Sequence, residues 1–502
     1  MNLVALADET IKTFGEYPFL IFDDQTFTNK QIIEDATMLA CNLMKLGVKK
    51  SDNVLVMLPN CPEVIISYQG ILRCGGVIVP LIPLMAEKEL THILANCEAV
   101  AMITIRDIFQ KNESMLLSNK TLKKIILLDD TAPGGTISFS QLIKDQADKV
   151  SLPAIGEEDL AVILYTAGTT STPKGVMLTH KNLYSCATNS SRAHDTKPSD
   201  ITLVALPLSH SFGLTSMNKA YKYGNLHILM RKFQVEEAFK LIEKYKVTDF
   251  PGAPAMFITM LNSPDAEKHN LSSLQGCLSG SAPFPVASLL AFQKKFNCTV
   301  YEAYGLSEAS PAVSTNYHNR PTEPGSIGQP IPEVEVRIVD DQDQDVAAGE
   351  VGELLVYGPN VSTGYYKLPD ETARTFRNGW LYTGDMARMD NDGYLYIVER
   401  KKDLIIRGGF NIYPRDLEEI LYQHLAVKDS VAIGVPDPVM GEEIKLYVVL
   451  KEGTKATTEE ILHYCQGQLA KNKWPKYIEF LGALPRNPMG KILHKELRKL
   501  NT

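Results

Sequence analysis

The chain has 502 residues, which is long enough for two or more domains. Hydrophobic residues make up 44% of it and charged residues 22%, a composition typical of a globular protein with an extensive core. The net charge of −8 argues against a nucleic-acid-binding surface, which needs clustered Lys and Arg, but it leaves room for an anionic small-molecule substrate.

Targeting and membrane signals are not apparent in the sequence. The N-terminal residues reach Asp8 and Glu9 with no basic segment before an apolar run, so we expect no signal peptide. No run of about 20 apolar residues occurs, so we expect no transmembrane segment. The eight cysteines are scattered without a Cys-x-x-Cys pair, which predicts buried thiols, no zinc site, no disulfide framework and a cytoplasmic location.

Short apolar runs alternate with helical patterns along the first part of the chain. Such alternation predicts βαβ units and largely parallel sheets, and a similar stretch covers residues 150–310. From Gly325 to Tyr396, short strands and many turns predict a small antiparallel or barrel-like unit. The clearest strand candidates of the first part are Asn53–Leu58, Val77–Pro80, Ala99–Ile105 and Lys124–Asp129.

A charged segment, Glu399–Asp403, precedes about 100 residues with their own αβ alternation. We place a domain boundary there, although a charge run is often only a solvated turn. The predicted fold class is α/β. An N-terminal domain, 1–400, holds two αβ-layered subdomains plus a small β-barrel-like unit, and a C-terminal α+β domain spans 401–502.

The strongest local signal is the segment Leu164–Gly175, with the sequence LYTAGTTSTPKG. Small residues let backbone N–H groups approach phosphate oxygens, hydroxyls donate further hydrogen bonds, and Lys174 supplies a positive charge. The spacing differs from that of a Walker A loop, in which Gly-Lys is followed by Ser or Thr. A Ser/Thr/Gly-rich loop by itself is often an ordinary turn, but the full string is far more specific.

This string resembles the signature loop of the adenylate-forming superfamily, which includes acyl-CoA synthetases, aryl-CoA ligases, luciferases and peptide-synthetase adenylation domains. The usual form is Y-T-S-G-T-T-G-x-P-K-G. Here Ala167 removes one hydroxyl, and Ser171 stands where a glycine is usual and restricts positive φ. The resemblance implies ATP contacts from Thr166, Gly168, Thr169, Thr170 and Lys174, with Thr169 and Lys174 also acting in catalysis.

Further segments resemble the superfamily in the same order along the chain. Leu206–Gly213 is similar to its P-L-x-H segment and would put His210 beside the acyl carboxylate or the thiol path. Ser279–Pro283 resembles a turn against adenine formed here by Gly280, Ser281 and Ala282. Tyr304–Glu308 resembles Y-G-x-T-E, which implies that Tyr304 stacks on adenine, that Gly305 and Ser307 line the nucleotide site, and that Glu308 helps to hold Mg²⁺.

Gly379–Asp385 resembles the ribose-binding segment, in which Asp385 accepts hydrogen bonds from the ribose hydroxyls and Arg400 donates to the same sugar. The resemblance makes Lys402 the hinge of a mobile C-terminal domain and places Gly408 and Gly409 along the coenzyme A channel. Lys491 corresponds to the lysine that meets the carboxylate and the α-phosphate during adenylation. By itself, each of these residues would be read as core or as solvated surface.

The resemblance implies that ATP and Mg²⁺ activate a carboxylic acid as an acyl-adenylate and that coenzyme A then takes the acyl group. A medium- or long-chain fatty acid is the first expectation and an aryl acid the second, since Phe212, Leu214, Met256 and Phe257 are candidates for an apolar pocket. Arg231 and Lys222 could serve a second carboxylate but are read as surface residues. Loading of an acyl carrier protein, a catalytically silent binding protein and a homodimer remain open alternatives.

Overall fold

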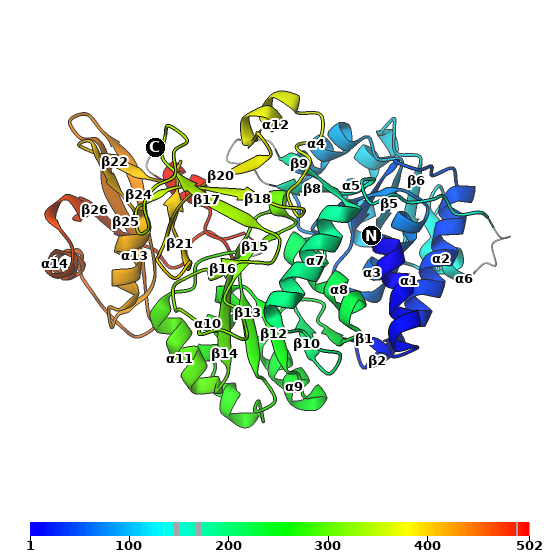
Figure 1. Ribbon diagram of the computed structural model, residues 1–502, viewed down its shortest axis with the longest axis horizontal. Coiled ribbons are helices and arrows are strands. Elements are labelled where there is room, and N and C mark those ends of the chain that lie inside the picture. The colour runs from blue at the N-terminus through cyan, green and yellow to red at the C-terminus, as the bar shows by residue number, and fades with distance from the viewer. Residues whose placement is uncertain (132, 145–149, 167–172, 488–489, 501–502) are drawn as a thin grey trace.

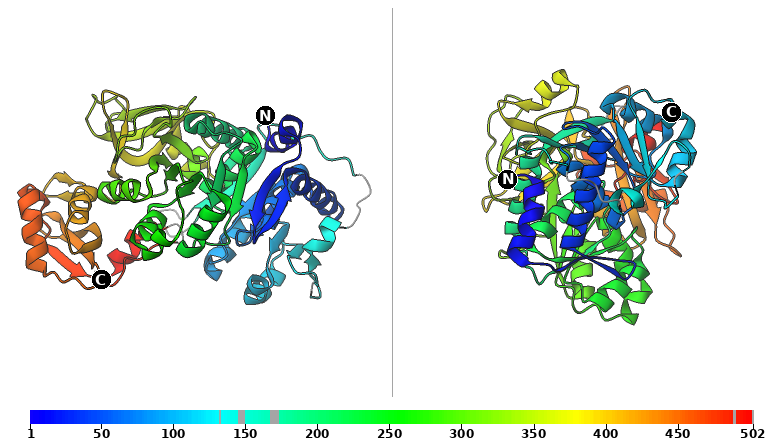
Figure 2. Two further views of the ribbon diagram at one scale, coloured as in Figure 1. Left: turned by 90° about the horizontal axis from the view of Figure 1, so that it is seen from below. Right: turned by 90° about the vertical axis from the view of Figure 1, so that its right-hand side faces the viewer.

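The computed structural model describes residues 1–131, 133–144, 150–166, 173–487 and 490–500. The fold is mixed α/β, with a large N-terminal domain and a small C-terminal domain, as the sequence predicts. In Figure 1 and in the left view of Figure 2, the C-terminal elements (orange to red) lie at the opposite end of the molecule from the first sheet (blue to cyan).

The first sheet has seven strands in the order β7-β6-β5-β3-β4-β8-β9. All neighbours are parallel except β8 and β9, which form an antiparallel hairpin. The four strand candidates of the sequence correspond to β3, β4, β5 and β6, because strands buried on both faces are nearly continuous apolar runs. The strands are β3 (Asn53–Met57), β4 (Val77–Pro80), β5 (Ala101–Thr104), β6 (Lys124–Leu127), β7 (Ile137–Ser138), β8 (Leu160–Thr166) and β9 (Lys174–Thr179), and the helices are α2 (Asn29–Lys45), α3 (Pro62–Arg73), α4 (Glu87–Cys97), α5 (Arg106–Ser118) and α6 (Phe139–Lys144).

The second sheet has nine strands in the order β16-β15-β14-β13-β12-β10-β11-β1-β2. The six central strands, from β14 through β13, β12, β10 and β11 to β1, pair in parallel. Antiparallel strands close both edges, β15 and β16 on one side and β2 on the other. Its strands are β1 (Pro18–Phe22), β2 (Gln25–Thr28), β10 (Ile201–Val204), β11 (Leu226–Leu229), β12 (Asp249–Gly252), β13 (Gly276–Ser279), β14 (Thr299–Gly305), β15 (Ala312–Thr315) and β16 (Gln329–Pro330). The helices of this part are α1 (Leu3–Phe14), α7 (His180–His194), α8 (Ser211–Tyr223), α9 (Val235–Tyr245), α10 (Pro254–Asn262) and α11 (Val286–Phe296).

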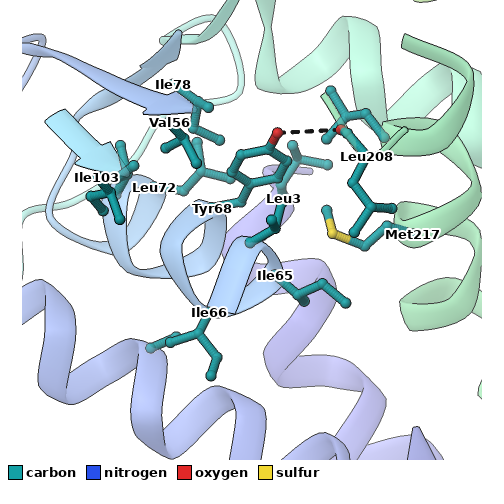
Figure 3. Packing of buried hydrophobic residues seen from close by; sticks show 14 of the residues in the cluster. Leu3, Val56, Ile65, Ile66, Tyr68, Leu72, Ile78, Ile103, Leu208 and Met217 are labelled. Carbon is teal, nitrogen blue, oxygen red and sulfur yellow. Dashed lines mark hydrogen bonds between the residues drawn. The ribbon is translucent and has the colours of Figure 1, made fainter. Parts of the chain in front are cut away.

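One hydrophobic core joins the two sheets. Side chains of α3 pack between strands of the first sheet and residues of the second subdomain (Figure 3). The Tyr68 hydroxyl donates a hydrogen bond to the Leu208 carbonyl at 3.2 Å, and Met217 of α8 lies in the same cluster. The two subdomains therefore form one packed body.

The third sheet is antiparallel, as the turn-rich segment predicts. It consists of β17 (Glu335–Val339), β18 (Gly352–Tyr357), β19 (Phe376–Arg377), β20 (Trp380–Met389) and β21 (Leu395–Arg400), with α12 (Pro369–Thr375) before β19. This sheet leads directly into the C-terminal domain.

The C-terminal domain has its own sheet and two hydrophobic clusters of its own. Its elements are β22 (Ile405–Arg407), β23 (Phe410–Ile412), α13 (Pro414–Tyr422), β24 (Val427–Asp437), β25 (Gly441–Leu450), α14 (Thr458–Gln468), β26 (Tyr477–Phe480) and α15 (His494–Lys499). Arg415 Nη1 donates to the Ile397 carbonyl at 2.7 Å, a contact with the third sheet. All eight cysteines are buried and carry free thiols, as the sequence predicts.

Candidate active site

A cavity of about 1240 Å³ lies where the N-terminal domain faces the C-terminal domain. Residues from β8, β9, α8, β14, β21 and the loop before α15 line it. Most residues implied by the motifs meet there, although they are distant in the chain. The predicted residues that line the cavity are Thr166, Lys174, His210, Gly280, Ser281, Tyr304, Gly305, Ser307, Glu308, Arg400, Lys402 and Lys491.

The phosphate loop connects two paired strands. β8 and β9 are antiparallel, and Thr166 stands opposite Lys174 in the register. Both residues line the cavity. The predicted contacts Gly168, Thr169 and Thr170 lie outside the described residues. The two described ends of the loop, Thr166 and Lys174, therefore both face the cavity.

Lys174 is held at the cavity wall by a carboxylate. Its ammonium pairs with Glu371 of α12 and lies 5.4 Å from the centre of the Tyr365 ring. The Lys174 side chain is 21% exposed. Glu371 therefore pairs with the same ammonium that the motif assigns to phosphate.

Glu308 presents its carboxylate to the cavity from a short 3-10 helix that follows β14. The Tyr365 hydroxyl donates to Glu308 Oε1 at 2.8 Å. The chain folds tightly before it, because a Cβ at Gly305 would lie 2.1 Å from the Pro311 carbonyl oxygen. Glycine is thus required for the chain to make this close approach.

Asp385 and Arg400 are cross-strand neighbours on β20 and β21. Arg400 Nε lies 2.9 Å from Asp385 Oδ1, and the Tyr304 hydroxyl donates to Asp385 Oδ2. Burial, followed by the charge of Asp385, raises the pKa of Tyr304 well above its usual value, so Tyr304 stays protonated as a donor. The Asp385 side chain is only 5% exposed and lies behind Tyr304 and Arg400, so it is not part of the cavity lining. The predicted adenine contact Ala282 also lies outside the cavity lining.

His210 begins α8 as its N-cap residue. Its Nδ1 accepts a hydrogen bond from the Phe212 backbone N–H at 3.3 Å, which leaves Nε2 as the protonated nitrogen of the neutral ring. Burial, followed by the charge of Lys491, lowers the pKa of His210 to about 4. The ring is therefore neutral near pH 7 and can donate one hydrogen bond into the cavity.

Lys491 enters the cavity from the C-terminal domain. Its backbone N–H donates to Asn487 Oδ1 at 2.9 Å, and a Cβ at Gly490 would lie 3.1 Å from Ala255 Cβ of α10. The Lys491 side chain has accessible surface because it faces the open cavity, yet protein surrounds it. Burial, followed by the charge of Arg400, lowers its pKa to about 8.

The remaining predicted positions lie at the junction and beyond it. Lys402 is exposed in the turn between β21 and β22 and lines the cavity. Gly408 and Gly409 form the tip of the β22–β23 hairpin, with φ of +57° and +82°, and are exposed outside the cavity lining. In this arrangement the hairpin does not contribute to the cavity.

The predicted acyl pocket agrees with the structure only in part. Phe212 lines the cavity, whereas Leu214 and Phe257 are buried in the core and Met256 packs against it. Arg231 pairs with Asp23 at the surface, in keeping with its interpretation as a surface residue.

Sequence reasoning missed the contacts that Glu371 and Tyr365 make, and it missed a lysine on α8. Lys219 lines the cavity but belongs to none of the motifs. Its signal was the helical spacing of Phe212, Ser216 and Lys219, which puts all three on one face of α8.

Along the described ranges, no helix has both the length and the apolar character needed to cross a bilayer. Nor do three or more His, Cys, Asp or Glu side chains gather there as a ready-made metal site.

Comparison with known proteins agrees with this geometry. Residues 7–366 match the family model described as AMP-binding enzyme, and residues 416–491 match that of the AMP-binding enzyme C-terminal domain. A protein of Bacillus subtilis named long-chain-fatty-acid–CoA ligase is 39% identical, over 100% of this chain and 95% of the relative. A protein of Citrobacter koseri named crotonobetaine/carnitine–CoA ligase is 32% identical, over 99% of each chain.

Solved structures give the same result. An anthranilate CoA ligase in complex with anthranoyl-AMP superposes with a TM-score of 0.94 at 27% identity, over 100% of this chain and 97% of the other. ATP-bound MatB from Rhodopseudomonas palustris superposes with a TM-score of 0.92 at 29% identity, over 100% and 99%. The family models, the relatives and the shared fold together show that this chain belongs to the AMP-binding enzyme family.

Proposed function

We propose that this protein is an AMP-forming acyl-CoA synthetase. It uses ATP to convert a carboxylic acid to an acyl-adenylate and then transfers the acyl group to coenzyme A, with release of pyrophosphate and AMP. The observation that carries the proposal is the meeting of Lys491 with Glu308, Arg400 and His210 in one cavity between the two domains. Relatives named as CoA ligases support the same activity.

In the first half-reaction, a carboxylate oxygen of the acid attacks the α-phosphorus of ATP, and the bond from that phosphorus to the pyrophosphate oxygen breaks. Two anions meet in this step, so cations that face the cavity stabilise the developing charge. Lys491 acts at the acid and the α-phosphate, and Lys174 acts at the leaving pyrophosphate. The neutral His210 orients the carboxylate by donating a hydrogen bond.

The nucleotide is held by residues of the third sheet and of β14. Arg400 donates to the ribose, and Asp385 accepts from its hydroxyls once Tyr304 moves toward the base. Gly280, Ser281 and Ala282 supply the narrow turn beside adenine, with Gly305 and Ser307 nearby. Thr166, Gly168, Thr169 and Thr170 belong to the phosphate loop.

Glu308 is suited to help hold Mg²⁺. Its carboxylate faces the cavity, and the hydrogen bond from Tyr365 engages one oxygen and leaves acceptor capacity on the other. Mg²⁺ commonly binds one or two carboxylates together with substrate phosphates and water, so a lone carboxylate fits it. The ion neutralises phosphate charge when bound.

In the second half-reaction, the coenzyme A sulfur attacks the acyl carbon, the bond from that carbon to the adenylate oxygen breaks, and AMP leaves. We propose that the C-terminal domain, 401–502, turns about Lys402 relative to the N-terminal domain, 1–400. This turn withdraws Lys491 and brings the hairpin of Gly408 and Gly409 to the thiol path. The exposed position of this hairpin outside the cavity supports a role in another arrangement.

The acid is proposed to be a medium- or long-chain fatty acid, and the location of the protein is proposed to be the cytoplasm. The name of the Bacillus subtilis relative supports the fatty acid. The anthranilate CoA ligase supports an aryl acid as the second candidate.

The test is AMP release from MgATP across a panel of acids, with and without coenzyme A. The proposal expects AMP release that depends on both a fatty acid and coenzyme A. If adenylate forms while coenzyme A leaves AMP release unchanged, the proposed acceptor is wrong. If no acid gives AMP or pyrophosphate, the proposed reaction is wrong.

A further inference from the structure

One arm of the cavity runs along α8, away from the nucleotide residues. Phe212, Thr215, Ser216 and Lys219 all line it. The last three follow Phe212 by three, four and seven residues, and this spacing places all four on one face of the helix. Because His210 begins α8 beside the proposed acid carboxylate, this arm is where the rest of the acid must lie.

The wall of the arm changes character along its length. The apolar part of the lining includes Phe212, two residues after His210, and Leu278 of β13. Around Lys219 the lining is polar and includes His194, Asn225 and His227 together with the carboxylates of Asp200 and Asp249. A plain alkyl chain that reached this end would meet polar groups and gain little from burial there.

Lys219 is the strongest feature of the far end. Its Nζ lies 3.1 Å from His194 Nδ1, while His194 Nε2 lies 3.0 Å from the Thr315 hydroxyl. Burial lowers the pKa of His194 well below its usual value, so its ring is neutral and its Nδ1 can accept from the ammonium.

No carboxylate oxygen among the described residues lies within 4.0 Å of Lys219 Nζ. Burial lowers the pKa of Lys219, and the charge of Asp249 partly opposes that effect. Asp249 itself has a pKa raised to about 6 by burial. Lys219 has three donors, so after His194 it retains capacity for an anionic partner inside the cavity.

We propose that Lys219 binds a second carboxylate at the far end of the acid, so that the preferred substrate is an α,ω-dicarboxylic acid. This inference rests on the proposed function, because it assigns the first carboxylate to the adenylation site. An apolar stretch followed by a buried ammonium matches a methylene chain that ends in an anion. Charge-assisted hydrogen bonds of this kind are the strong ones.

The distance along α8 sets the length of the diacid. Lys219 is nine positions after His210, which corresponds to about 13 Å along the axis of α8 at 1.5 Å per residue. An extended chain advances roughly 1.2 Å per bond, and helical side chains lean toward the N-terminus. A diacid of roughly eight to twelve carbons therefore spans the two sites.

The experiment measures kcat/KM for coenzyme A-dependent AMP release with matched acids of about eight to sixteen carbons. At each length, the plain fatty acid, the ω-hydroxy acid and the diacid are compared. The wild-type protein is expected to favour the diacid over the plain acid at one or more lengths between eight and twelve carbons. A plain or ω-hydroxy acid that exceeds the diacid at every length overturns the inference but leaves the acyl-CoA synthetase activity standing, whereas no turnover with any acid removes the proposed function itself.

The variant Lys219→Leu identifies the group responsible. It is expected to lower kcat/KM for the diacid by roughly 10- to 100-fold and to leave or raise that for the plain acid. The matched control is Lys222→Leu on the same helix, where Lys222 donates to the Tyr184 hydroxyl outside the cavity lining. An equal loss with both acids in Lys219→Leu, or the same loss of diacid preference in Lys222→Leu, contradicts the assignment. If Lys219→Leu does not fold, the comparison of acids with the wild-type protein decides alone.

Discussion

Lys491 gives the sharpest prediction, because its surroundings bring its titration into an accessible range. Its pKa is lowered to about 8 by burial and by the charge of Arg400, so the ammonium is the major form at pH 7 and a minor form at pH 9. The proton-bearing fraction falls about tenfold between these two values. If adenylation needs the ammonium, kcat/KM for ATP should fall about tenfold over the same interval.

The assay is pyrophosphate exchange into ATP with the acid far below saturation and no coenzyme A, so that titration of the thiol plays no part and ATP meets the enzyme without bound acid. The parameter kcat/KM reports groups of the free enzyme, which is the state described by the structure. The variant Lys491→Arg keeps its positive charge at every pH used, so its kcat/KM for ATP should not decline above pH 8. Lys476→Arg is the control, because Lys476 is an exposed lysine paired with Asp437, and it should keep the wild-type profile.

Lys491→Ala separates the two half-reactions. Loss of one group that stabilises transition-state charge typically lowers kcat by 10²- to 10³-fold, so adenylation should fall by about that factor. Transfer from synthetic acyl-AMP to coenzyme A should change by less than about threefold, because Lys491 is proposed to be withdrawn in that step. A decline above pH 8 that persists in Lys491→Arg, or equal losses in both half-reactions of Lys491→Ala, would refute this reasoning.

Three further predictions concern the other side of the site. Asp385→Asn removes the charge that faces Arg400, and we expect KM for ATP to rise roughly tenfold or more in steady-state titrations, since a hydrogen bond to a charged group is lost; an unchanged KM would contradict the ribose assignment. Glu371→Gln frees Lys174 from its ion pair and should lower the dissociation constant of ATP by up to about fivefold in calorimetry, whereas weaker binding would show that Glu371 assists the nucleotide. Gly305→Ala places a Cβ 2.1 Å from the Pro311 carbonyl oxygen and should destabilise the fold by about 1–3 kcal/mol in thermal unfolding. The control Gly467→Ala in α14, where a Cβ would meet open space, should not destabilise it. Equal melting temperatures for the two variants would count against the packing described.

Much of the first sheet could be predicted from the sequence. The residues of β3, β4, β5 and β6 form nearly continuous apolar runs, and such a run can be recognised as a strand from its own residues alone. The pairing of β1 with β11 could not be predicted, because it joins segments about 200 residues apart and depends on the folded core.

The site shows the same division between local and tertiary information. Motifs indicated Lys174, Glu308 and Lys491 because each lies in a recognisable string. They carried no information on Glu371, whose contact with Lys174 arises only when α12 packs beside β9. Lys219 occupies an intermediate position, since helical spacing after Phe212 indicates its face but not the cavity beside it.

The central claim is that the acid is activated through its own carboxylate as an acyl-adenylate. The most direct measurement uses an acid with both carboxylate oxygens replaced by ¹⁸O, together with MgATP and coenzyme A, and determines the isotope content of AMP and pyrophosphate by mass spectrometry. Attack of the carboxylate on the α-phosphorus leaves one labelled oxygen on AMP and none on pyrophosphate. Label in pyrophosphate, or AMP without label while acyl-CoA accumulates, would contradict the account.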